Sequence, residues 1–240
     1  MKTTLLITLI LLTLQSCQPK SKGTKEKRKQ TTTQVSIDID DSIEGQYLAV
    51  FETVNPKITS RITGAFTFSR EKELDEVVGD VRITNAGVKV IHAQNVRQGR
   101  RCPNLDDDKN HDGIIDATEG ETVYGAILFP LDGDLSSQSS HDGEFPMGDV
   151  YGNYIYSRVS IFSEFISDLR AEPAFDGYPK LKPKEPLRIE GRAVVIHGYD
   201  DAADLPPSVG TIGRRTAAQT IPIACGIVHK VLSLPGEVTD

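Results

Sequence analysis

The chain reads Arg61-Ile62-Thr63-Gly64-Ala65-Phe66-Thr67-Phe68-Ser69 in a stretch where apolar and polar side chains alternate. The large apolar residues Ile62, Phe66 and Phe68 share one parity, and the threonines share the other. A period of two is that of a β-strand with one buried face and one face in water. The stretch therefore predicts an antiparallel strand that packs one face on a core.

Similar segments recur along the chain, rich in Val, Ile, Phe and Thr and separated by polar, glycine or proline turns. Seven further strands are predicted, at Gln46–Val54, Glu76–Thr84, Val88–Asn95, Thr122–Phe129, Tyr154–Phe162, Leu187–His197 and Pro222–His229. No amphipathic helix is predicted. Eight short strands indicate an all-β fold, an antiparallel sandwich or barrel. The segments 130–153, 163–186 and 198–221 are expected to be long loops, which often carry function.

A calcium-binding motif is indicated between the fourth and fifth predicted strands. Gly113 stands at position six of a twelve-residue loop that begins at Asp108 and ends at Glu119. This is the EF-hand spacing, in which position seven contributes a backbone carbonyl and position twelve a bidentate carboxylate. The predicted ligands of Ca²⁺ are Asp108, Asn110, Asp112, the carbonyl of Ile114, Asp116 and Glu119. The alternative is a solvated acidic turn.

The N-terminal segment has the pattern of a signal peptide. Lys2 precedes the apolar run Leu5–Leu14, which is too short to span a bilayer. The run ends in Leu14-Gln15-Ser16-Cys17, which resembles a bacterial lipobox. Residues 1–16 are therefore predicted to be removed and Cys17 to be lipidated. The alternative is an ordinary secretory signal with an unrelated cysteine, and in both cases the chain is exported.

Charge is distributed unevenly. The net charge is −7, and residues 1–34 contribute +6, which leaves −13 for residues 35–240. An acidic domain is a poor nucleic-acid binder, so no nucleic-acid partner is expected. The basic, Thr- and Gln-rich stretch 17–44 predicts a disordered tether whose lysines face anionic lipid headgroups.

The lipid anchor makes the membrane the expected partner, and no protein partner is indicated. The expected location is the bacterial cell envelope. Gln18, rather than an aspartate, follows the lipidated cysteine. By resemblance to known sorting signals, this favours the outer membrane.

Cysteine usage agrees with export. Acylation of Cys17 leaves Cys102 and Cys225, which are expected to form a disulfide in an oxidising compartment. The alternative is two separate buried thiols.

Two C-terminal segments resemble motifs of the copper/zinc superoxide dismutase family. Gly191–Asp201 is similar to the family's Gly-Arg-x-x-Val-Val-His strand with its following Asp pair. Ile223–Val228 is similar to the family's terminal Ala-Cys-Gly-Val-Ile strand. Further upstream, Gly87–Gln94 falls on the family's His-x-His strand and Gly148–Val150 on its Gly-Asp-Leu turn. The family's disulfide also joins positions that correspond to the two cysteines named above.

The resemblance covers roughly residues 45–230. It implies an eight-stranded antiparallel Greek-key β-barrel with long loops for the domain 45–234, with the calcium loop inserted at 104–120.

The resemblance also implies which residues remain from the family's metal centre. His92 and His197 match copper ligands, Asp149 matches the zinc aspartate, and His141 is the one histidine of the zinc-loop region. Gln94 stands where a further copper histidine is expected, and an amide is a poor copper ligand beside imidazole. The family's full site uses six histidines and an aspartate, whereas this chain has five histidines in total. Calcium is therefore the expected cofactor, copper is a second candidate, and zinc is not expected.

Two functions follow from these patterns. The first is an exported lipoprotein with a superoxide dismutase-like metal-binding domain and a calcium-binding loop, catalytically impaired. The alternative is an active copper-dependent superoxide dismutase that protects the cell envelope. An acidic domain repels superoxide unless a local basic patch focuses it, and Arg214 and Arg215 are the basic residues expected near the mouth of the site.

Overall fold

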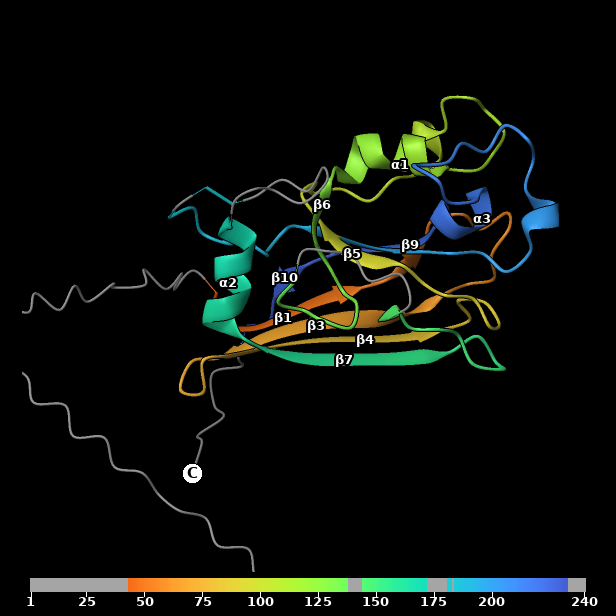
Figure 1. Cartoon of the computed structure of the whole chain (residues 1–240). Helices are drawn as coiled ribbons and strands as arrows, with labels where there is room; N and C mark the ends of the chain where they lie inside the picture. Colours follow the sequence, from red (N-terminus) through yellow and green to blue (C-terminus); the bar gives the residue numbers. More distant parts are fainter. Residues whose placement is uncertain (1–42, 138–143, 172–180, 183, 233–240) are drawn as a thin grey trace, which may run out of the picture. The chain divides into compact units, whose positions relative to one another are not determined.

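Two antiparallel β-sheets form the described part of the chain, which comprises residues 43–137, 144–171, 181–182 and 184–232 of the computed structural model (Figure 1). The chain divides into two units, 1–36 and 37–240, and every described residue belongs to the second. The predicted signal peptide, residues 17–42 of the predicted tether, and His141 lie outside the described residues. The predicted end of the tether at residue 44 is wrong, because Ile43 is already buried in the core.

Each sheet has five strands, in the orders β10-β1-β3-β4-β7 and β2-β9-β8-β5-β6. The strands are β1 (Gly45–Val50), β2 (Glu52–Thr53), β3 (Thr63–Glu71), β4 (Glu76–Thr84), β5 (Gln94–Arg97), β6 (Ile127–Pro130), β7 (Tyr154–Ile161), β8 (Ala193–His197), β9 (Pro222–Ile227) and β10 (His229–Lys230). Of the two forms predicted, sandwich and barrel, the described residues adopt the sandwich, and the sheets do not close into a barrel.

The predicted alternation of buried and exposed side chains in Arg61–Ser69 is confirmed. Ile62, Phe66 and Phe68 are buried, whereas Thr63 and Thr67 are exposed. The ring of Phe68 lies 6.2 Å from that of Phe129 in the facing sheet, measured between centroids. The apolar side chains on one face of β3 therefore pack into the core between the two sheets.

Both faces of β8 are buried, which alternation alone does not predict. Val194 and Ile196 belong to the core between the sheets. Val195 instead belongs to a second cluster, together with Ile115 of the predicted calcium loop and Tyr124 of helix α1 (Ala117–Tyr124). Figure 1 shows α1 on the outer side of this sheet. The calcium-loop segment thus covers a sheet face that would otherwise meet water.

Helices occupy two places where the sequence indicated strand or loop. The predicted strand Thr122–Phe129 is wrong in its first part, because α1 continues to Tyr124 and the strand starts at Ile127. Helix α2 (Phe162–Arg170) was not predicted, although Phe162, Phe165, Ile166 and Leu169 recur at helical spacing and are all buried. Three shorter helices are η1 (Leu105–Asp107), η3 (Ala202–Asp204) and α3 (Ala217–Thr220).

The predicted disulfide between Cys102 and Cys225 is present, with the two Cα atoms 5.7 Å apart. It joins the segment in front of η1 to the buried strand β9. The start of the predicted calcium loop is therefore attached covalently to the second sheet.

Candidate calcium loop and the adjacent cavity

Residues 108–116 curl around their own polar side chains. The Gly113 N–H donates to Asp108 Oδ2 at 2.7 Å, the Asp112 N–H to Asn110 Oδ1 at 2.9 Å, and the Ile114 N–H to Asp112 Oδ1 at 2.8 Å. Gly113 has φ of 83°, in the left-handed region that favours glycine. The side chains at loop positions one, three and five thus all face the interior of the turn.

Helix α1 begins at position ten of the loop and is capped by residues of the motif. Asp116 Oδ1 accepts from the Thr118 and Glu119 N–H groups, and Glu119 Oε2 accepts from the Asp116 N–H at 3.0 Å. This is a capping box. Burial opposes ionisation of Asp116, but hydrogen bonds, among them one from Gly210, outweigh burial and lower the pKa of this carboxyl.

Glu119 also closes the loop. Its Oε1 accepts from the Lys109 N–H at 2.7 Å and from the Asn110 N–H at 3.2 Å. Position twelve therefore reaches back to positions two and three, so the first and last predicted ligands lie in one neighbourhood.

Asp108 carries a buried carboxylate oxygen that is left unpaired within the loop. The residue is 6 % exposed, and its Oδ1 has no hydrogen-bond partner in the described part of the chain. Buried polar atoms in native proteins are nearly always paired, and a buried carboxylate oxygen is costly without a partner. A cation bound in the loop would satisfy this oxygen.

Asn55 anchors the loop to the sandwich, and sequence reasoning missed it. Its Oδ1 accepts from the Ile115 N–H at 2.7 Å, and its Nδ2 donates to the carbonyls of Ile115 at 2.9 Å and of Pro222 at 2.8 Å. One buried amide thus joins loop position eight to β9. Nothing local in the sequence signals this role, because both partners are distant in the chain.

A second loop, 198–216, rests against the calcium loop. The Ser208 hydroxyl donates to Asp112 Oδ2 at 2.5 Å, and the Gly210 N–H donates to Asp116 Oδ2 at 2.6 Å. Two of the predicted calcium ligands therefore also hold this neighbouring loop in place.

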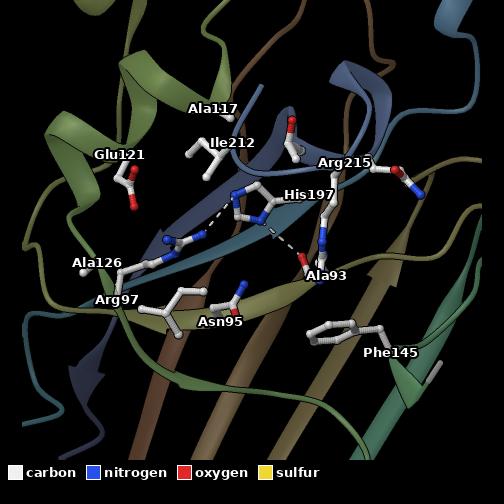
Figure 2. A pocket seen from close by; sticks show the side chains of 13 residues that line it. Ala93, Asn95, Arg97, Ala117, Glu121, Ala126, Phe145, His197, Ile212 and Arg215 are labelled. Carbon is white, nitrogen blue, oxygen red and sulfur yellow. Dashed lines mark hydrogen bonds between the residues drawn. The ribbon is translucent and has the colours of Figure 1, made fainter. Parts of the chain in front are cut away.

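A cavity of about 320 Å³ lies beside α1, on the outer face of the second sheet (Figure 2). It is bounded by β5, α1, the end of β8, the 198–216 loop and α3. Its lining residues are Ala93, Asn95, Arg97, Ala117, Glu121, Ala126, Ile127, Phe145, His197, Ile212, Arg215, Gln219 and Thr220.

His197 lies in this cavity wall with both ring nitrogens engaged. Its Nδ1 lies 3.2 Å from the Ala93 carbonyl, and its Nε2 lies 3.2 Å from Arg97 Nη2 (Figure 2). The carbonyl only accepts and the guanidinium only donates, which assigns the proton to Nδ1 and the lone pair to Nε2. Burial, followed by the charge of Arg97, holds the pKa of His197 well below its ordinary value.

His92 faces the opposite side of the same sheet. Its ring stacks on Tyr154 with centroids 5.3 Å apart, and its Nδ1 donates to the His197 carbonyl at 3.0 Å. Burial lowers the pKa of His92. Gln94, of the same parity, accepts from the Tyr154 hydroxyl at 3.0 Å inside the sandwich. The segments that carry His92 and His197 therefore lie side by side. Their imidazole rings nevertheless point to opposite faces of the sheet, that of His92 into the sandwich and that of His197 into the cavity.

Asp149 has a turn-forming role. Its Oδ1 accepts from the N–H groups of Tyr151 at 2.8 Å and Asn153 at 2.9 Å. Of the four residues matched to the copper/zinc centre, the structure describes His92, Asp149 and His197, and it does not converge them on one point. Within the described residues, no group of three or more His, Cys, Asp or Glu side chains is arranged to hold a metal, since the loop carboxylates bind N–H groups instead.

No family model matches the chain, and no curated protein matches it at a significant level. In the part of the chain that the structure describes, no helix is long and apolar enough to cross a membrane. The geometry of the loop and of the cavity is therefore the basis on which function is inferred.

Proposed function

We propose that this protein is an exported, lipid-anchored calcium-binding protein of the bacterial cell envelope, built on a superoxide dismutase-like sandwich without a working dismutase centre. The observation that carries the proposal is the loop 108–119, which combines EF-hand spacing, the inward-facing side chains of its early positions and a buried, unpartnered oxygen on Asp108.

The residue types and their spacing suit a calcium ion, which would take the place of N–H groups that the loop carboxylates now bind. Asp108, Asn110, Asp112 and Glu119 would bind it through side-chain oxygens and Ile114 through its carbonyl. Both oxygens of Asp116 already accept hydrogen bonds, so this residue would act through a water, as position nine often does. Glu119 would exchange the N–H groups of Lys109 and Asn110 for the ion. The ion would relieve repulsion among the carboxylates and stabilise the turn.

The superoxide dismutase-like part of the proposal is supported by topology. Strands β1, β3, β4 and β7 form one sheet and β6, β5, β8 and β9 the other, with connections that cross between the sheets. This order is compatible with the eight-stranded Greek key that the sequence motifs imply. The disulfide between Cys102 and Cys225 is a second point of likeness. The anchor at Cys17 and the outer-membrane location rest on the sequence.

The residues around His197 do not fit a copper ion. The lone pair of its Nε2 accepts from the Arg97 guanidinium, a fixed positive charge that opposes a cation at the same place. His92 turns its ring into the core and Gln94 is engaged by Tyr154. This arrangement favours the catalytically impaired protein over the active dismutase.

The calcium proposal is tested by thermal unfolding of the purified protein with and without Ca²⁺. With a Kd near 10⁻⁴ M, calcium at a hundredfold excess over Kd stabilises the fold by about 2.7 kcal/mol, and Tm rises accordingly. Glu119→Gln should abolish most of this rise. Glu121→Gln, on the same helix but outside the ligand positions, is the matched control and should keep it. An unchanged melting curve at millimolar calcium would contradict the proposal.

The second test measures superoxide consumption by copper-loaded protein, alongside His92→Ala and His197→Ala. We expect all three proteins to consume superoxide no faster than the same amount of copper in buffer without protein. Rapid turnover that both substitutions remove would restore the enzyme as the better explanation.

A further inference from the structure

The cavity beside α1 has features of a ligand site that the calcium proposal does not use. Its volume of about 320 Å³ falls in the range of small-molecule pockets, about 300–1,000 Å³. It combines a polar floor on β5 with apolar walls from three separate segments. Those walls are formed by Ala126, Ile127, Phe145 and Ile212.

The floor of the cavity is positively charged. Arg97 is 6 % exposed, stacks over the Tyr124 ring at 4.7 Å and lies against neutral His197. Arg215 lines the same cavity and lies near enough to His197 to oppose its protonation. Among the described residues that line the cavity, Glu121 is the one acidic residue, and it is exposed to water, where its charge is screened. The buried part of the cavity therefore favours an anion.

Asn95 supplies an independent sign of a ligand. Its side chain is 3 % exposed, lines the cavity, and has an Oδ1 without a hydrogen-bond partner in the described residues (Figure 2). An amide carries both a donor and an acceptor, and half a turn about its last bond exchanges them. A carboxylate only accepts hydrogen bonds, so it would bond to the Nδ2 group of Asn95, either as placed or after this half turn.

We propose that this cavity binds a small organic carboxylate. The guanidinium groups of Arg97 and Arg215 hold the carboxylate, which such planar donor groups match in geometry. Asn95 donates its amide hydrogen to the same group, and the walls around Phe145 and Ile212 enclose the apolar body. The ligand thus has one negative charge and a compact hydrophobic part.

The test uses isothermal titration calorimetry of the purified protein with benzoate, benzamide, acetate and inorganic phosphate as probes. Benzoate should bind, whereas benzamide, without the charge, and acetate and phosphate, without the apolar body, should bind at least about tenfold more weakly. Binding of benzamide equal to that of benzoate would overturn the recognition of a carboxylate. Equal binding of acetate or phosphate would overturn the role of the apolar walls.

Two neighbouring arginines provide a matched pair of variants. Arg215 lines the cavity, whereas Arg214 is exposed and does not. Arg215→Gln should weaken benzoate binding about tenfold, and Arg214→Gln should change it less than about twofold. Arg215 is only half-buried, so its substitution leaves the core intact. No benzoate binding up to about 10 mM, or equal losses in the two variants, would overturn the proposal.

Discussion

Asn55→Ala offers the sharpest check on how the calcium loop is held to the sandwich. The Asn55 side chain is 0 % exposed and forms three hydrogen bonds to backbone groups. Truncation leaves the N–H and the carbonyl of Ile115 and the carbonyl of Pro222 without this partner. Each buried group that loses its partner costs about 1–3 kcal/mol, and partial access of water reduces the sum to about 3–6 kcal/mol. A domain whose unfolding free energy is about 5–15 kcal/mol should lose much of its stability.

The assay is urea unfolding of the wild type and of two variants, Asn55→Ala and Asn95→Ala. Both substitutions delete the same atoms from a buried asparagine, but the Asn95 Oδ1 has no partner within the described residues. Asn95→Ala should therefore cost less than about 1 kcal/mol. Asn55→Ala should in addition weaken calcium binding, because loop position eight loses its anchor. Equal losses in the two variants, or a loss below about 1 kcal/mol for Asn55→Ala, would refute the reasoning.

Two further predictions concern the same region. Cys225→Ala should lower the unfolding free energy by about 2–5 kcal/mol, measured by urea unfolding, because the cross-link to Cys102 spans 123 positions of sequence; a variant as stable as the wild type would contradict this. The hydrogen-bonded ion pair with Arg101 lowers the pKa of Asp107 to about 2, from an ordinary value of 3.8. The charged carboxylate therefore stabilises the fold above about pH 3.8, and this contribution is lost as the pH falls toward 2. Asp107→Asn should flatten that part of a stability-against-pH curve, whereas Asp106→Asn should not; identical curves would contradict the assignment.

Most strands could be predicted from sequence because their signals are local, although β5 and β8 each begin six residues later than predicted. The calcium-loop motif is also a local signal, and calcium binding stays a prediction. The alternation around Phe66 and the position of Gly113 each depend on residues only a few steps apart. Helix α2 is not predicted although its helical spacing is also local, because Phe162 also completes the apolar pattern of the predicted strand Tyr154–Phe162. Helix α1 is only partly predicted because its capping box uses Asp116 and Glu119, which are also positions of the calcium motif. The sequence is therefore interpreted as a calcium loop and not as the start of a helix.

The arrangement of the predicted copper/zinc ligands and the cavity could not be predicted from sequence. The spacing of residues 92 and 94 predicts that they share one face of a strand, but β5 begins at Gln94 and His92 precedes it. The sequence also does not say which face of the sheet lies inside the sandwich. Packing decides this: Tyr154 stacks on His92 and hydrogen-bonds to Gln94 on the inner side, which turns Asn95 and Arg97 outward.

The sequence by itself determined that the fold is mostly β and that the two cysteines pair, since these depend on short-range patterns and on residue counts. It also predicts calcium binding by residues 108–119 from spacing alone. Tertiary structure decided which side chains meet. Arg97, His197 and Arg215 come from segments far apart in the chain, and they meet only because the second sheet, α1 and the 198–216 loop pack around one cavity. The contact between the Arg97 guanidinium and His197 joins residues 100 positions apart. It forms only when the core packs, so no local sequence pattern predicts it.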